Sequence, residues 1–164
     1  MSEYSKEFVK DVAKRTKENL KKYKGHYDTT QLLNSAVGLL IIPHANYYKK
    51  IENSFVSSKV LNIMRNAIQK NSYPEDKKPY ELKDIVKHIR NGIAHSNLYF
   101  EAIDNELHTI QIKDHKNGYT KTNKKTGSSK KVPAADFEII LSISNLREFM
   151  IEFADAIISM DTIK

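Results

Sequence analysis

The chain has 164 residues, of which 40% are apolar and 29% are charged, and it carries a net charge of +7. This balance is typical of a globular protein and excludes an intrinsically disordered one, and the length favours a single domain over residues 1–164. No apolar stretch approaches the roughly 20 residues of a membrane-spanning helix. The absence of cysteine excludes disulfide scaffolds, thiolate zinc sites and cysteine nucleophiles. The N-terminal residues lack the apolar core of a secretory signal, so we expect a cytoplasmic protein without a membrane partner.

Positive charge is concentrated in two segments. Residues 1–24 contain eight Lys or Arg and four acidic residues, and residues 113–131 contain seven lysines and a single acidic residue. Residues 132–164 instead carry six acidic residues against two basic ones. A basic loop beside a basic helix attracts a polyanion such as RNA or DNA, although a lysine-rich surface also serves solubility alone.

Two helices are predicted in the N-terminal third of the chain. Apolar residues with helical spacing predict the first over residues 4–24, ending near Gly25. The second is predicted to begin at Asp28, where Gln31 completes a capping box, and to end at Pro43. Because this second helix is apolar nearly all round, we expect it at the centre of the core.

Two further helices are predicted in the middle of the chain. Ser57 or Ser58 caps a helix that extends to Ile68, and a polar loop then spans residues 71–79. The fourth helix begins near Tyr80. Its apolar residues recur on one face: Leu82, Ile85, Val86, Ile89 and Ile93.

The pattern changes from helix to strand after Ser96. Alternating residues predict two short strands over residues 99–103 and 107–113, joined by a tight turn. Residues 115–131 are polar and contain turn signals, and residues 137–141 predict a third short strand.

The C-terminal segment is predicted to be a helix capped by Asn145, with Glu148 as the second member of the capping box. Together these elements indicate a mainly α fold, a bundle of four to five helices with a small β-hairpin inserted before the C-terminal helix. The hairpin and the basic loop occupy about residues 99–141.

The fourth helix carries a group of polar residues opposite its apolar face. On a helical wheel Asn91, His95 and His88 lie together on that side, with Arg90 at its flank. Histidine transfers protons near neutral pH, and arginine stabilises the negative charge of a phosphoryl transition state. The amide of Asn91 is placed to fix the imidazole or to contact a phosphate. The same spacing also fits an ordinary solvated face, and Gly92 lowers helix propensity by about 1 kcal/mol relative to Ala.

The six residues from Arg90 to His95, Arg-Asn-Gly-Ile-Ala-His, resemble the signature of the HEPN superfamily. That signature is an Arg, a polar residue that is often Asn, three further residues and a His. The segment from Leu33 to Pro43 is similar to the Pro-terminated second helix, containing Gly-Leu-Leu, of one bacterial HEPN branch with an inserted hairpin. HEPN domains are bundles of four to five helices with the signature on a late helix, so the layout agrees over most of residues 4–160.

This resemblance implies a metal-independent endoribonuclease that acts in toxin–antitoxin, abortive-infection or antiphage systems. Such proteins are usually homodimers with a composite cleft, in which Arg90 and His95 are catalytic and Asn91 supports them. The RNA 2′-hydroxyl attacks the adjacent phosphorus, with His95 as general acid or base, and leaves a 2′,3′-cyclic phosphate and a 5′-hydroxyl. No metal and no cofactor is implied. RNA, a second copy of the chain, and an antitoxin or a nucleotidyltransferase are the expected partners.

Other polar residues have weaker assignments. His88 lies on the same helix face as His95 and is either a second acid–base group in contact with RNA, or a residue that is solvated or lies at a dimer rim. A metal site at His108, Asp114 and His115 is disfavoured, because such a set is common near a flexible loop. The basic loop is a candidate to bind RNA or an acidic antitoxin through its lysines: Lys121, Lys124, Lys125, Lys130 and Lys131.

Two alternatives to a ribonuclease stay open. HEPN domains also occur as non-catalytic modules that bind RNA or a protein partner, and the signature can arise by coincidence in an unrelated helical protein. A ribonuclease requires Arg90 and His95 to line a shared cleft, whereas a binding module tolerates any arrangement of these residues.

Overall fold

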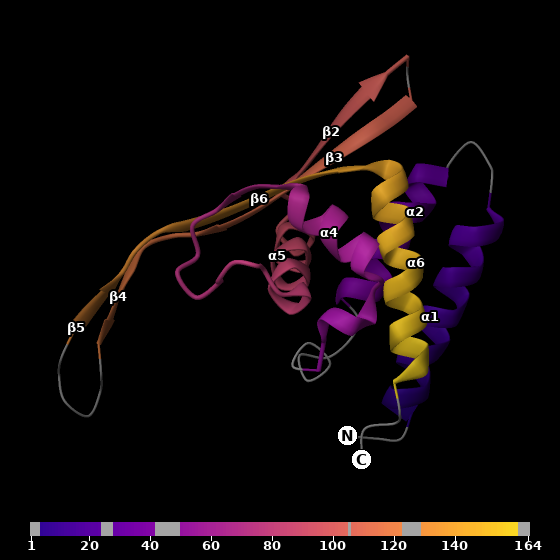
Figure 1. The fold of residues 1–164 in the computed structure, drawn as a ribbon, viewed down its shortest axis with the longest axis horizontal. Coiled ribbons are helices and arrows are strands. Elements are labelled where there is room, and N and C mark those ends of the chain that lie inside the picture. Colours follow the sequence, from indigo (N-terminus) through magenta and orange to yellow (C-terminus); the bar gives the residue numbers. More distant parts are fainter. Residues whose placement is uncertain (1–3, 24–27, 42–49, 105, 123–128, 161–164) are drawn as a thin grey trace.

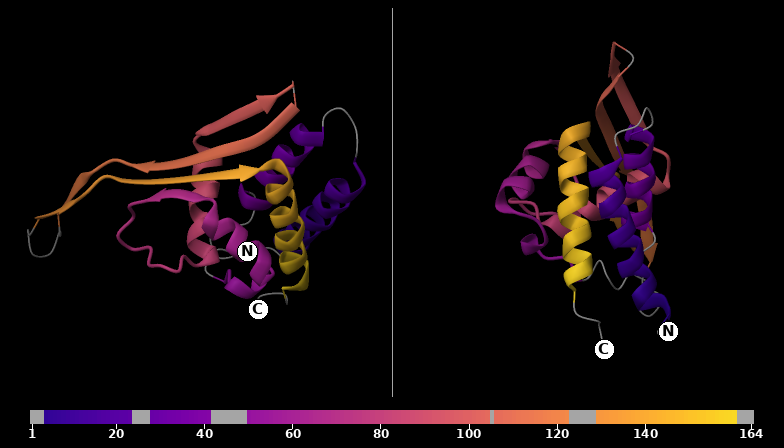
Figure 2. Two further views of the ribbon diagram at one scale, coloured as in Figure 1. Left: turned by 45° about the horizontal axis from the view of Figure 1, so that its top comes forward. Right: turned by 90° about the vertical axis from the view of Figure 1, so that its right-hand side faces the viewer.

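The computed structural model describes residues 4–23, 28–41, 50–104, 106–122 and 129–160 (Figure 1). In these residues a layer of helices lies against one face of an antiparallel sheet, and a thin two-stranded ribbon extends away from both layers (Figures 1 and 2). Each described helix is too short or too polar to cross a membrane.

Five α-helices lie in the described residues: α1 (Tyr4–Lys22), α2 (Asp28–Ile41), α4 (Ser58–Asn66), α5 (Leu82–Ala94) and α6 (Ile143–Ser159), with a short 3-10 helix, η1 (Asn53–Phe55), before α4. In this layer α6 contacts α1, α2 and α4, and α2 contacts α1, α5 and α6. Although α2 buries Leu32 and Leu40, it leaves Val37 exposed, so its apolar surface is not enclosed all round.

The sheet is larger than the predicted hairpin. Its strands follow the order β1 (Ile68–Asn71), β6 (Ala135–Ser142), β3 (Glu106–Lys116) and β2 (Leu98–Ile103), and all neighbours are antiparallel. A separate ribbon pairs β4 (Tyr119–Thr122) with β5 (Ser129–Val132), within the segment predicted to be a polar loop. The expectation of a small hairpin was therefore wrong in extent, while the mainly helical fold class is confirmed.

Strand β1 is the element that sequence patterns missed. Ile68 was predicted to continue a helix, but it pairs with Ile139 of β6, and the carbonyl of Ala67 accepts a hydrogen bond of 3.0 Å from the amide of Ile140. These partners lie about 70 residues further along the chain, so local hydrophobic periodicity could not predict the pairing of β1 with β6. The predicted strands at residues 99–103, 107–113 and 137–141 are confirmed within β2, β3 and β6.

The ends of two helices show where capping predictions succeed and fail. The hydroxyl of Ser57 accepts a hydrogen bond from the amide of Val60 at 3.2 Å, which confirms the predicted start of α4. The last helix begins earlier than predicted, because Ser142 at the end of β6 accepts from the amide of Asn145 at 3.1 Å. The predicted helix ends at Gly25 and Pro43 lie outside the described residues.

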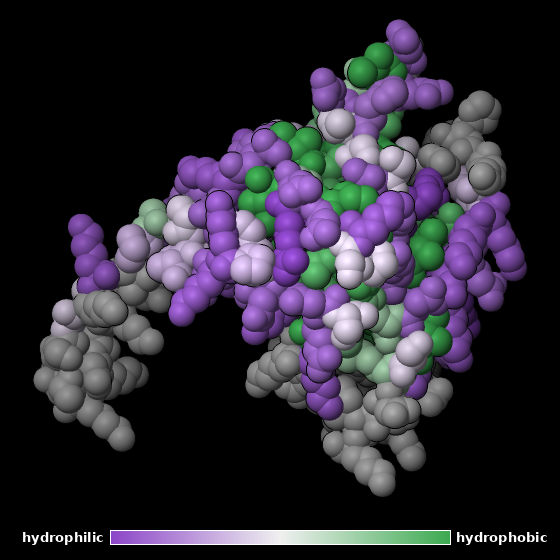
Figure 3. All heavy atoms as spheres, in the orientation of Figure 1, coloured by the Kyte–Doolittle hydropathy of each residue, from purple (hydrophilic) through white to green (hydrophobic). Residues whose placement is uncertain are grey.

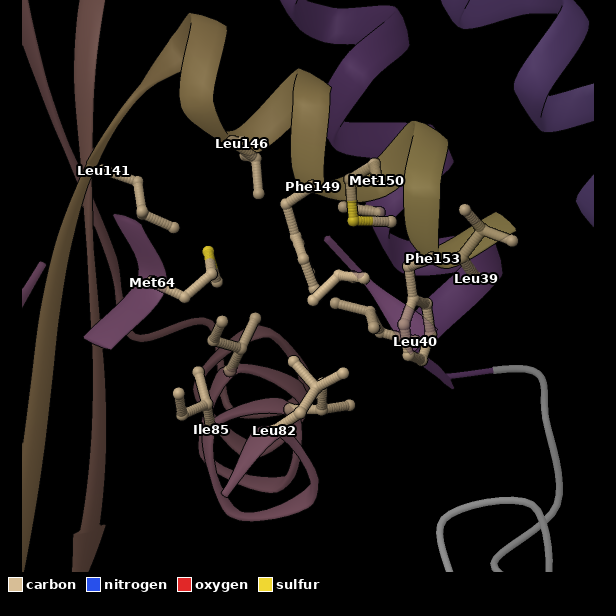
Figure 4. Close-up of a cluster of buried hydrophobic side chains, with 14 of the residues drawn as sticks. Leu39, Leu40, Met64, Leu82, Ile85, Leu141, Leu146, Phe149, Met150 and Phe153 are labelled. Carbon is tan, nitrogen blue, oxygen red and sulfur yellow. The ribbon is translucent and has the colours of Figure 1, made fainter. Parts of the chain in front are cut away.

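The core fills the space between α2, α4, α5, α6 and the sheet (Figure 4). Phe149 of α6 is fully buried and lies among side chains of the other elements, including Leu40 of α2, Met64 of α4 and Leu82 of α5. Burying a side chain of this kind contributes roughly 1.5–3 kcal/mol. Hydrophobic residues also reach the surface at the outer end of the β2–β3 hairpin (Figure 3), where Ile103 is exposed.

Candidate functional site

Helix α5 and its C-cap carry the Arg-Asn-Gly-Ile-Ala-His segment, and α5 contacts α2, α4 and strand β3. Its predicted apolar face is confirmed by burial of Leu82, Ile85, Val86 and Ile89. The opposite side of α5 is not an open face, because β3 passes directly against it.

Gly92 is the residue that allows this close approach. A Cβ atom built on Gly92 would lie 2.8 Å from the carbonyl oxygen of Lys113 and nearer still to Cγ2 of Ile112, both on β3. Real Cβ atoms do not approach a backbone oxygen so closely, so any side chain here would push the helix from the strand. The weak helix propensity of Gly92 is therefore explained by packing and does not disrupt the helix.

The end of α5 is fixed by a hydrogen-bonded cap in which His95 is the C-cap residue. The amide of Asn97 donates to the carbonyl of Gly92 at 2.9 Å, and the amide of Ser96 donates to that of Ile93 at 3.1 Å. With Ser96 at a φ of 56°, these bonds form a Schellman motif, although a glycine is more usual at that position. The backbone that carries His95 is thus held rigidly to the last turn of α5.

His95 itself is exposed. In the part of the chain that the structure describes, its imidazole makes no side-chain hydrogen bond and no ion pair. The site therefore presents a titratable ring to solvent from a well-fixed backbone, as a general acid or base requires.

His88 has the opposite environment, which corrects the expectation that it is solvated or lies at a dimer rim. Its side chain is fully buried. Nδ1 lies 2.7 Å from Oδ2 of Asp114 on β3, and Nε2 lies 2.7 Å from Oδ2 of Asp76 in the loop before α5. The ring stacks on Phe137 with a centroid distance of 4.5 Å, and Tyr73 lies beside it at 4.3 Å. An enclosed side chain of this kind has no surface with which to contact RNA.

His88 forms a structural clamp with the carboxylates of Asp76 and Asp114. Each carboxylate faces one ring nitrogen, so either the imidazole carries two protons or one of the carboxyl groups is protonated. In both cases the protons are held between buried groups. The clamp of Asp76, His88 and Asp114 joins the loop before α5 to the helix and to β3.

Asn91 is attached to the same clamp, because its Nδ2 donates to Oδ2 of Asp114 at 3.1 Å. Burial opposes the negative charge of Asp114, but the hydrogen bonds from His88 and Asn91 outweigh it and lower the pKa of Asp114. Burial and then the charge of Asp114 raise the pKa of Tyr73, whose hydroxyl stays protonated. Asn91 is thus oriented towards β3.

The four candidate residues on α5 and its C-cap therefore lie in different environments. His88 is buried, Arg90 and Asn91 are half-buried, and His95 is exposed. The Nε atom of Arg90 lies in the interior. The helical wheel placed Asn91, His95 and His88 on one solvated stripe, and this placement was wrong because β3 covers part of the stripe and the helix ends at Ala94.

A comparison with protein families gives this geometry a context. The HEPN pEK499 p136 family model matches residues 1–163. The chain belongs to this HEPN family. No curated protein and no solved structure matches the chain. Membership of the HEPN superfamily, expected from residues 90–95 and 33–43, is confirmed, and it favours a nuclease, RNA-related or toxin-type role.

The other predicted site residues of this HEPN protein lie far from α5 or have different contacts. In the ribbon, Lys121 pairs in register with Lys130, and Lys131 is exposed, whereas Lys124 and Lys125 lie outside the described residues. No group of three or more metal-ligating side chains occurs among the described residues.

The three residues that were weighed as a metal site do not form one. Asp114 faces the interior, whereas the ring of its neighbour His115 is bound to Asp136 on the open face of the sheet. This follows from the alternation of side chains along a strand. His108 is exposed nearer the other end of β3.

Sequence reasoning missed Asp76, Tyr73 and the role of Asp114. Asp76 lies 12 positions from His88 in the chain, and Asp114 lies 26 positions from it. No periodicity or motif links residues at such spacings, so only the folded arrangement identifies the clamp.

Proposed function

We propose that this HEPN protein is a metal-independent endoribonuclease and that it acts as a toxin or an antiphage effector. The observation that supports the proposal is the contrast within the signature segment. His95 is exposed on a rigid cap, while Arg90 and Asn91, half-buried in the last turns of the same helix, are held against the body of the protein.

The proposed reaction is attack of an RNA 2′-hydroxyl on the adjacent phosphorus. The 2′-oxygen forms a bond to phosphorus, and the bond from phosphorus to the 5′-oxygen of the next nucleotide breaks. His95 removes the proton from the 2′-hydroxyl or gives one to the leaving 5′-oxygen. Arg90 stabilises the extra negative charge on the phosphoryl oxygens. The products are a 2′,3′-cyclic phosphate and a 5′-hydroxyl, and the nucleophile is internal to the RNA.

One exposed histidine supplies only one of the two proton transfers. We propose that a homodimer supplies the second, with His95 of the partner subunit or a water molecule in the complementary role. The cleft between the two chains would then be the composite active site. An antitoxin or a nucleotidyltransferase remains a proposed partner of the dimer.

The ribbon of β4 and β5 is a proposed RNA contact. It extends away from the body of the protein (Figure 1) and carries Lys121, Lys130 and Lys131, while Lys124 and Lys125 lie in the segment between its strands. Lysines on such an arm attract RNA phosphates, and a deletion of residues 120–131 should weaken RNA binding and its salt dependence. An unchanged affinity after this deletion would remove the ribbon from the RNA-binding surface.

The proposal is tested by incubating purified protein with mixed cellular RNA and tRNA in EDTA. We expect cleavage by the wild type and at least a hundredfold slower cleavage by His95→Ala and Arg90→Ala. His108→Ala is the matched control, since it removes an exposed histidine from β3, and it should cleave like the wild type. A folded, dimeric wild type without activity would favour a non-catalytic HEPN module that binds RNA or a protein.

A further inference from the structure

An open pocket with a volume of about 570 Å³ lies beside β1, between the end of α4 and the loop that leads into α5. Three of its lining residues are cationic, namely Arg65, Lys70 and Lys78, and none of the residues that line it is acidic. The pocket belongs neither to the signature segment nor to the lysine-rich ribbon.

Two of the three positive charges have no counter-charge among the described residues. Nζ of Lys70 is paired with Oδ2 of Asp136 at 2.5 Å. Arg65 and Lys78 make no ion pair in the described part of the chain, and Nζ of Lys78 lies 5.8 Å from the ring centroid of Tyr80. A concave surface with two uncompensated cations attracts an anion.

The walls of the pocket are held by hydrogen bonds and do not need a ligand to form. Nε of Arg65 donates to the carbonyl of Tyr80 at 2.8 Å, which fixes the guanidinium across the pocket. Nδ2 of Asn71 donates to Oδ2 of Asp76 at 2.9 Å, and that same oxygen contacts His88 of the clamp. A pre-formed site of this kind loses little conformational entropy on binding.

We propose that this pocket binds a phosphate group of an RNA strand at a point remote from His95. The choice of RNA rests on the proposed function. With Nε engaged, the terminal nitrogens of Arg65 have the planar geometry that suits phosphate oxygens, and Lys78 adds a second positive charge. The pocket is lined by the end of α4, by β1 and by the loop before the first residue of α5, whereas His95 follows the last residue of α5 and does not line it. An RNA strand that reaches His95 would thus be bound at a second point, in the pocket.

The test measures binding without cleavage. A fluorescent 2′-O-methyl oligonucleotide lacks the attacking hydroxyl, so its affinity is independent of the proposed reaction. We expect Arg65→Gln/Lys78→Gln to weaken binding about tenfold and to reduce the slope of log affinity against log salt by about 0.7, the value of one phosphate contact. The control Lys50→Gln/Lys59→Gln removes the same charge from exposed positions outside the pocket, the basic N-terminal helix and the ribbon, and it should leave the slope unchanged.

Four outcomes overturn the pocket proposal. The first is an equal loss of affinity in the pocket variant and the control, the second is no loss in the pocket variant, and the third is no binding by the wild type. The fourth is inorganic phosphate binding as tightly as the oligonucleotide, which indicates a small-anion site. Because Arg65 also holds Tyr80, Lys78→Gln is measured alone, and this exposed substitution should weaken binding about threefold with unchanged thermal unfolding.

Cleavage of unmodified RNA in EDTA separates this proposal from the proposed function. Binding that depends on the pocket, without cleavage by the wild type, retains the pocket and rejects the ribonuclease. Cleavage by the wild type, with pocket variants that bind RNA normally, retains the ribonuclease and rejects the pocket.

Discussion

His88 and His95 lie seven positions apart at the end of the same helix, and they have opposite environments. His88 is enclosed between two carboxylates and two aromatic rings, whereas His95 is exposed on the cap that ends the helix. The difference arises from neighbouring elements, since β3 and the loop before α5 cover the first position and leave the second open. The imidazole of His88 thus stabilises the fold, whereas the proposed function gives the proton transfer to that of His95.

The largest expected difference between these histidines is in stability. His88→Ala leaves two buried carboxylates without their shared partner, and we expect it to lower the free energy of unfolding by about 3–5 kcal/mol. His95→Ala removes an exposed side chain and should change that free energy by less than about 0.5 kcal/mol. Urea unfolding of both variants measures the difference, and a loss below about 1 kcal/mol for His88→Ala would contradict the clamp.

Two glycines in helices test the close approach of α5 to β3. Gly92→Ala places a Cβ atom against the carbonyl of Lys113, so we expect a loss of about 1–3 kcal/mol despite the better helix propensity of Ala. Gly38→Ala in α2 is the matched control, because its Cβ would lie 3.8 Å from Val12, an ordinary contact. It should stabilise the protein by about 0.5–1 kcal/mol. Stabilisation by Gly92→Ala, as expected for Gly38→Ala, would show that packing at Gly92 is not tight.

The lowered pKa of Asp114 predicts a pH dependence of stability. Because its folded-state pKa lies below the ordinary 3.8, its contribution is present above that pH and is lost as the pH falls through the folded-state value. The stability advantage of the wild type over Asp114→Asn should therefore shrink between pH 5 and pH 2. Asp136→Asn, at an exposed pair with Lys70 and His115, should show a weaker dependence. An advantage over Asp114→Asn that persists unchanged at pH 2 would argue against a charged Asp114.

The smallest expected effect is at the open face of the sheet. The hydrogen bond to Asp136, followed by that to Asn117, raises the pKa of His115 above its ordinary value of 6.5. The small stability that this pair adds is present below pH 6.5 and is lost as the pH rises through the folded-state pKa. An NMR titration of His115 should show the raised pKa, and Asp136→Asn should return it towards 6.5. A titration that Asp136→Asn does not move would place His115 away from this carboxylate.

The sequence predicted the features that depend on nearby residues. Each of these features depends on residues within a few helical turns: the apolar face of α5, the Ser57 cap and the contiguous segment from Arg90 to His95. The last of them indicated the family. Strand β1 and the clamp could not be predicted, because Ile68 and His88 find their partners in distant parts of the chain. The helical wheel also assumed that α5 continues through His95 with its polar side free.

The most direct test of the central claim is the chemical identity of the RNA ends produced in EDTA by the wild type and by His95→Ala. The assignment of chemistry to His95 predicts 2′,3′-cyclic phosphate and 5′-hydroxyl ends from the wild type, identified by mass spectrometry, and their absence with a His95→Ala protein of unchanged stability. Wild-type products with 5′-phosphate and 3′-hydroxyl ends, or cyclic-phosphate ends that persist in His95→Ala, would contradict it.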